Sequence, residues 1–170
     1  MYEGTMHIFE RIAYRIQEWR LLRRCDTREQ FADYVVTKLR TPEKIAWWIS
    51  QTIFYVKEDI PQWYSIDVAL KAKEGNCTEM ACLAKFALGY LPEYKAEIAC
   101  IYGEDKDRVK KGHAICCFST PDLRGSINGG TVKFYSTIAP WPMIILETVP
   151  TWLATTSYFT NDKGKKIIVD

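Results

Sequence analysis

The chain has few of the features that mark membrane, secreted or nucleic-acid-binding proteins. No apolar run approaches the roughly 20 residues that a membrane span requires, and the first residues lack the basic-then-apolar order of a signal peptide. The formal net charge of +2 is too small to require nucleic acid or an anionic membrane as a partner. We therefore expect a cytoplasmic protein that binds neither membranes nor nucleic acids.

Histidine is also scarce, whereas cysteine is not: the 170 residues include two histidines and six cysteines. Six cysteines in a secreted protein would suggest three disulfides, but a chain with 48% hydrophobic residues can build a core without them. We expect reduced thiols. Cys82, Cys100 and at least one of Cys116 and Cys117 are predicted to be buried as small core hydrophobes.

One of the cysteines stands at a predicted helix start, in residues 74–83. Asn76 is a good N-cap, and Glu79 can complete a capping box with it. Gly75 permits a backbone conformation that a side chain would forbid. Cys77 then takes the first helical position, where the partly positive end of the helix dipole is expected to lower the pKa of its thiol.

The order of the remaining elements predicts an α+β fold. Apolar residues at helical spacing predict helices over residues 6–24, 27–40, 41–57 and 77–90, and alternation predicts strands over 94–102, 113–118, 131–137 and 143–149. Residues 59–64, 103–112 and 120–130 are predicted loops, and a hairpin is expected over 157–169. The expected architecture has N-terminal helices and a central, nucleophile-bearing helix packed on an antiparallel sheet.

A possible partner for the thiol is His113, at the head of a predicted strand. A cysteine nucleophile needs an imidazole to take its proton and to protonate the leaving group. Gly75-Asn76-Cys77-Thr78-Glu79-Met80-Ala81, followed by a strand and then Gly112-His113-Ala114, resembles the core of the transglutaminase-like superfamily of papain-like cysteine enzymes.

The resemblance extends upstream, because residues 42–55 are similar to the helix that precedes the nucleophile in that superfamily and residues 65–73 to the short helix that leads to it. It covers a core of about residues 41–140. Together with an N-terminal helical extension over 6–40, this implies a single domain of residues 1–170. The resemblance also implies acyl transfer without a cofactor or metal.

The superfamily's third catalytic residue, an aspartate on the strand after the histidine, has no match in this sequence. Alignment places Tyr135 or Ser136 at that position, and neither is an anion at neutral pH. Asp122 and Asn128 lie in the predicted loop before it and are the alternatives. The departure allows a catalytic dyad, a triad completed by an unexpected residue, or a fold retained for binding.

Gln62, Trp63 and Asn76 are candidates for binding substrate or its oxyanion. Papain-like sites often combine the N–H of the nucleophile with a side-chain donor, for which Gln62 or Gln51 is suitable. Trp63 follows Gln62 in the sequence, and Asn76 directly precedes Cys77. His7 is given no role.

Zinc is a weaker alternative for the cysteines and His113. The adjacent residues Cys116 and Cys117 point to opposite faces of a strand, and Cys77 and Cys82 lie roughly 140° apart around a helix. Neither pair can bind one ion together.

These observations favour a cysteine-dependent acyl-transfer enzyme acting on a protein or peptide amide. The acyl group would pass to water, as in a peptidase, amidase or deamidase, or to an amine, as in a transamidase. The alternative is an inactive transglutaminase-like module that binds a protein partner, and the missing aspartate is its main support.

Overall fold

The computed structural model of the chain describes residues 25–57, 65–151, 154–160 and 166–168. The helix expected over 6–24, with His7, and the loop residues Gln62 and Trp63 lie outside these ranges. The helices within them are α2 (Arg28–Thr37), α3 (Pro42–Thr52), α4 (Ile66–Ala72), α5 (Cys77–Leu88) and α6 (Trp141–Leu146).

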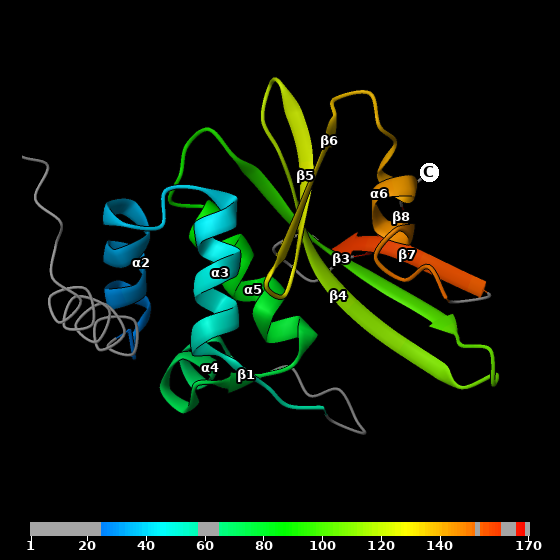
Figure 1. Ribbon diagram of the computed structural model, residues 1–170, viewed down its shortest axis with the longest axis horizontal. Helices are drawn as coiled ribbons and strands as arrows, with labels where there is room; N and C mark the ends of the chain where they lie inside the picture. The colour runs from blue at the N-terminus through cyan, green and yellow to red at the C-terminus, as the bar shows by residue number, and fades with distance from the viewer. Residues whose placement is uncertain (1–24, 58–64, 152–153, 161–165, 169–170) are drawn as a thin grey trace, which may run out of the picture.

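Most of the strands form one antiparallel sheet with the spatial order β6-β5-β4-β3-β7-β8 (Figure 1). They are β3 (Lys95–Glu104), β4 (Lys110–Ser119), β5 (Leu123–Asn128), β6 (Thr131–Ser136), β7 (Ala154–Thr160) and β8 (Lys166–Ile168). The strands β1 (Phe54–Tyr55) and β2 (Glu74–Gly75) form a separate parallel pair. The expected α+β class is confirmed, and β7 and β8 pair antiparallel as the C-terminal hairpin signal predicted.

The two faces of the sheet carry different clusters of buried residues. Ala114, Cys116 and Phe118 on β4 pack with residues of α5, whereas Ile115 and Cys117 pack with residues of α6 and the loop after it. This alternation follows from the two-residue period of a strand. The sheet is therefore covered by α5 on one face and by α6 on the other.

The helix α5 occupies the centre of the larger cluster. Its burial results from an almost continuous apolar sequence, and the residues buried along it are Thr78, Glu79, Met80, Ala81, Leu83, Ala84, Ala87 and Leu88. The helix contacts both β4 and α3. Its N-terminus is consequently fixed relative to the sheet.

The helices α2 and α3 start at the predicted caps. The Thr27 side chain accepts from the Gln30 N–H in a capping box, and Thr41 caps α3 with Pro42 in its first turn. The buried rings of Phe31 and Trp48 stack with centroids 4.4 Å apart, which joins the two helices. No helix among the described residues is long and apolar enough to cross a membrane.

Three of the predicted helix, strand and loop assignments were wrong. Residues 120–130 contain the strand β5, residues 143–149 lie mostly in the helix α6, and α3 ends at Thr52 instead of continuing to residue 57. The strand β5 contains residue types that are common in turns, so the sequence predicted a loop there. A short apolar run such as 143–149 does not distinguish a strand from a helix by periodicity, and the proline-rich entry to α6 favours the helix.

Candidate active site

Cys77 stands at the first position of α5, directly after the small β1–β2 sheet. The Thr78 N–H donates to Asn76 Oδ1 at 2.8 Å and the Asn76 N–H donates to Glu79 Oε2 at 2.9 Å, so the predicted cap and capping box are confirmed. Gly75 is needed for space, because a Cβ there would lie 2.9 Å from the Glu79 Cβ. The side chain of Asn76 is thus used to start the helix.

The sulfur of Cys77 is partly buried against the sheet. The Ala114 N–H, on β4, and Thr78 donate hydrogen bonds that favour the thiolate. Burial outweighs these donors, and the fully buried Glu79 carboxylate opposes a second negative charge, so the pKa of Cys77 is raised above its ordinary value. The expectation that the helix dipole lowers this pKa was wrong, because the dipole acts in a desolvated site.

The imidazole of His113 is held by Asn128, the last residue of β5. Its Nε2 lies 2.9 Å from Asn128 Oδ1. Because Oδ1 only accepts, Nε2 carries the proton and Nδ1 keeps a lone pair that can act as a base. Burial lowers the pKa of His113, and the hydrogen bond to Asn128 partly offsets this effect.

The Cys77 sulfur contacts the main chain of β4 at Ala114, the residue that follows His113. The strand β5 pairs with β4 only along residues 116–119, which leaves the edge at Ala114 to the Cys77 sulfur. Ala114 faces α5, and alternation places His113 on the other face, with Ile115. No hydrogen bond joins the Cys77 sulfur to the His113 ring within the described residues. The Cys77 sulfur is therefore placed one residue along β4 from His113, and burial favours the neutral form of both groups.

The residues aligned with the missing aspartate lie elsewhere. The Tyr135 hydroxyl donates to Glu147 Oε2 at 3.0 Å, and burial together with this carboxylate raises the pKa of Tyr135 to about 12. Ser136 Oγ accepts from the Ile138 N–H at 3.5 Å. The prediction that Tyr135 or Ser136 lies beside His113 was wrong, because β5 separates β6 from β4.

The strand β5 also lies between Asp122 and Asn128, the two other candidates for the third catalytic residue. Asp122 precedes β5 and is exposed, and its N–H bonds to Thr120 Oγ1. Asn128, which ends β5, lies beside His113.

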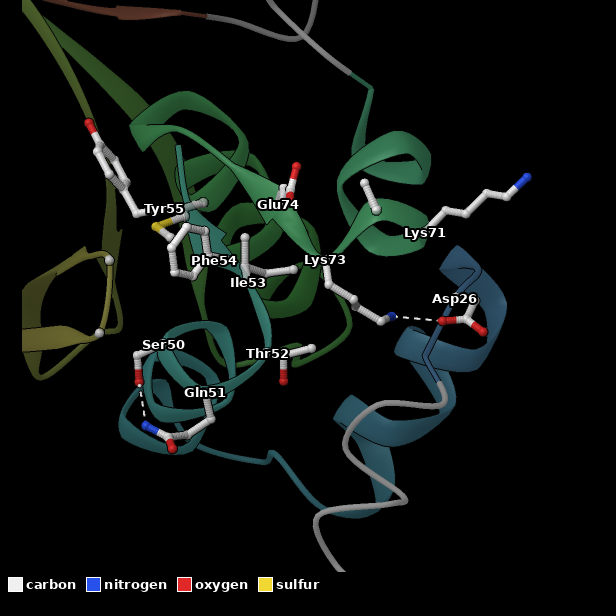
Figure 2. A pocket seen from close by; sticks show the side chains of 14 residues that line it. Asp26, Ser50, Gln51, Thr52, Ile53, Phe54, Tyr55, Lys71, Lys73 and Glu74 are labelled. Atoms are coloured by element: carbon white, nitrogen blue, oxygen red, sulfur yellow. Dashed lines mark hydrogen bonds and ion pairs between the residues drawn. The ribbon is translucent and has the colours of Figure 1, made fainter. Parts of the chain in front are cut away.

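A cleft of about 810 Å³ opens beside the site (Figure 2). It is lined from α3 and β1 by Ser50, Gln51, Thr52, Ile53, Phe54 and Tyr55, from the α4–α5 region by Lys71, Ala72, Lys73, Glu74 and Met80, and from elsewhere by Asp26, Gly129 and Gly130. Gln51, one of the proposed oxyanion donors, lies here with its amide 3.4 Å from Ser50 Oγ.

Tyr55, on the wall of this cleft, was not predicted as a site residue, because the sequence pattern placed it in a helix. It is 51% exposed, and its pKa is raised by burial and by the neighbouring Cys77.

Thr52, on the cleft wall, is 8% exposed, and its hydroxyl has no hydrogen-bond partner. We expect Thr52→Val to leave the fold intact and to raise the free energy of unfolding by about 1 kcal/mol, because an unsatisfied buried hydroxyl is removed at nearly constant shape. Urea denaturation measures the change. Ser50→Ala, which removes an exposed hydroxyl from the same helix, is the control, and an equal gain there would contradict this explanation.

The chain matches no protein-family model and no curated protein sequence. Among the described residues, no three histidine, cysteine, aspartate or glutamate side chains are grouped as metal ligands would be. None of the six cysteines forms a disulfide, and Cys100, Cys116 and Cys117 are buried as predicted, whereas Cys82 is partly exposed. What bears on the function is thus the geometry around Cys77.

Proposed function

We propose that the protein is a cysteine-dependent acyl-transfer enzyme of transglutaminase-like type that acts on an amide of a protein or peptide. The observation that carries this proposal is that the Cys77 sulfur accepts from the Ala114 N–H, next in the chain to His113, whose ring is held by Asn128. Asparagine takes the place of the aspartate that the superfamily uses. The pair starts neutral, so His113 acts as a general base and not as half of a preformed ion pair.

In the proposed reaction, Nδ1 of His113 accepts the thiol proton as the Cys77 sulfur attacks the carbonyl carbon. The oxyanion forms near the Cys77 N–H, at the positive end of α5. The imidazolium then protonates the departing amine, and the C–N bond breaks to leave a thioester on Cys77. Water or a second amine attacks the thioester and releases the acyl group.

The proposal is tested with p-nitrophenyl acetate, an activated acyl donor that needs little binding. We expect a burst of nitrophenolate equal to the enzyme concentration and one acetyl group on Cys77 by mass spectrometry. Cys77→Ala should abolish both, and His113→Gln should slow acylation by about 100-fold, because a positioned base contributes this much. Acetyl transfer to added glycinamide would identify a transferase. A burst of unchanged size in Cys77→Ala would overturn the proposal.

A separate prediction concerns the pH dependence of Cys77 alkylation by iodoacetamide. Because the pKa of Cys77 is raised above the ordinary value of 9.0, less than about 1% of the thiol is ionised at pH 7, and the rate should still be rising at pH 9. Glutathione, measured in parallel, gives the profile of a free thiol. A rate that levels off below pH 8 would show that the thiolate is stabilised at rest.

The second candidate is a binding module without activity. The raised pKa of Cys77 and the lack of a direct hydrogen bond to His113 favour it. Under this alternative, no acetyl group accumulates on Cys77, and Cys77→Ala retains the affinity for the partner.

A further inference from the structure

We propose that the cleft binds an extended polypeptide segment, which adds as a strand to the outer edge of β1 and leads to Cys77. This inference rests on the proposed function, because the bound segment would be the acyl donor. It adds that the substrate is recognised through its main chain and must be locally unfolded.

Among the described residues, the hydrogen bonds of β1 leave one edge of this strand without a partner. The Phe54 N–H donates to the Lys73 carbonyl at 2.7 Å, and the Val56 N–H donates to the Gly75 carbonyl at 3.0 Å. In a parallel pair the residue between two such donors directs its own N–H and C=O to the opposite edge. Accordingly, the main chain of Tyr55 makes no hydrogen bond to another described residue. This edge offers one donor and one acceptor to an added strand.

The β1–β2 pair is too small to be a structural sheet alone. Each of its strands has two residues, and Phe54 and Tyr55 are 73% and 51% exposed. An exposed edge beside aromatic side chains is a template for strand addition. A third strand would satisfy the main chain of Tyr55 and cover part of both rings.

The cleft is continuous with the proposed catalytic residues. Tyr55 lies close enough to Cys77 for the two ionisations to interact. Met80, which lines the cleft, lies on α5 one turn after Cys77, and Gly129 follows Asn128 directly. A chain in the cleft would therefore extend past β1 toward the thiol and Asn128.

The charges of the cleft favour main-chain recognition over a charged ligand. Lys73 is neutralised by Asp26 at 2.8 Å, as Figure 2 shows, and Lys71 and Glu74 balance each other on the same wall. A phosphate or a strongly charged peptide would find no excess of opposite charge.

The test compares Tyr55→Pro with Tyr55→Ala, using acetyl-trialanyl chloromethyl ketone as the probe. Both variants lack the aromatic ring, but only proline also lacks the N–H, and an outward N–H at a strand edge is where proline is tolerated. The thiolate of Cys77 displaces chloride to form a thioether, which is followed by intact mass. Rates are divided by the iodoacetamide rate of each variant. We expect a rate about tenfold lower in Tyr55→Pro than in Tyr55→Ala, the loss of one hydrogen bond. Rates within a factor of two would overturn the inference.

Two further measurements keep the inference testable. One applies if Tyr55→Pro folds poorly, and the other applies if the Cys77 thiol does not react. On the wild-type protein, N-methylation of the probe amides should reduce labelling about tenfold, and equal rates would overturn the inference. If iodoacetamide does not label Cys77, the proposed function fails. The Tyr55 amide resonance of ¹⁵N-labelled Cys77→Ala then decides the binding mode. A shift on addition of acetyl-trialanine methylamide supports strand addition, and an unchanged resonance overturns it.

Discussion

Gly125→Ala is expected to destabilise the protein by about 3 kcal/mol or more, at the upper end of what overpacking costs. A Cβ at this position of β5 would lie 2.2 to 2.8 Å from three atoms of the Phe118 ring. Phe118 is 1% exposed, and its ring packs edge-on against Tyr94 and Phe134 with centroids 5.7 and 5.9 Å away. The ring has no space into which it can move. Because domains are stable by only about 5 to 15 kcal/mol, much of the variant should unfold at moderate urea concentration.

The matched control is Gly112→Ala on β4. Its Cβ would lie 3.3 Å from the ring of Tyr102, which is 47% exposed and can move aside, so the change should stay below about 1 kcal/mol. Adding Phe118→Leu to Gly125→Ala should cost less than the sum of the two single changes, since the smaller side chain relieves the overlap. Additive losses in urea titrations would show that Gly125 acts through something other than this contact.

Gly125 also explains why β5 could not be predicted from the sequence. Glycine, serine and asparagine within Leu123–Asn128 are typical of turns, and the need for glycine arises from a ring on the neighbouring strand. The turn after β5 did follow local rules: Gly129, with φ of 55°, and Gly130 join β5 to β6 as a two-residue hairpin loop. Tertiary packing, not local preference, decided the assignment of β5.

The failure to predict β5 from the sequence has a direct consequence for the site. If residues 120–130 form a loop, the strand that carries Tyr135 and Ser136 is the next one after the strand of His113 and is expected to pair with it directly. The actual order β6-β5-β4 moves that strand one position outward and puts the end of β5 beside the imidazole. Asn128 had been one of the alternatives, but no sequence pattern favoured it over Asp122.

The start of α5 was predictable because its determinants are local. Asn76, Cys77 and Glu79 lie within one turn, and the cap depends only on their spacing. The pKa of Cys77 was not predictable in the same way. It depends on burial against β4 and on the Glu79 carboxylate, which the fold encloses near the sulfur.

Asn128→Asp is expected to raise the rate of Cys77 alkylation at pH 7 by about tenfold. A carboxylate beside a histidine raises the histidine pKa by roughly one to three units, so the ring of His113 becomes cationic at neutral pH. Under the proposed function this cation then lowers the pKa of the Cys77 thiol. Ser136→Asp introduces the same charge at an exposed position away from the ring and serves as the control. An equal increase in Ser136→Asp, or no change in Asn128→Asp, would exclude Asn128 as the partner that orients the imidazole.

The pH dependence of stability gives an independent measurement on the same variant. In the wild-type protein the folded pKa of His113 is lowered, so the unfolded chain binds more protons and the contribution of this group to stability is lost as the pH falls below about 6.5. In Asn128→Asp the folded pKa is raised, and the contribution reverses: it is fully present below the unfolded pKa and is lost as the pH rises through the folded value. Relative to wild type, the variant should therefore gain stability between pH 7.5 and pH 5.5 in urea titrations. Parallel pH profiles for the two proteins would show that Asn128 does not control the ionisation of His113.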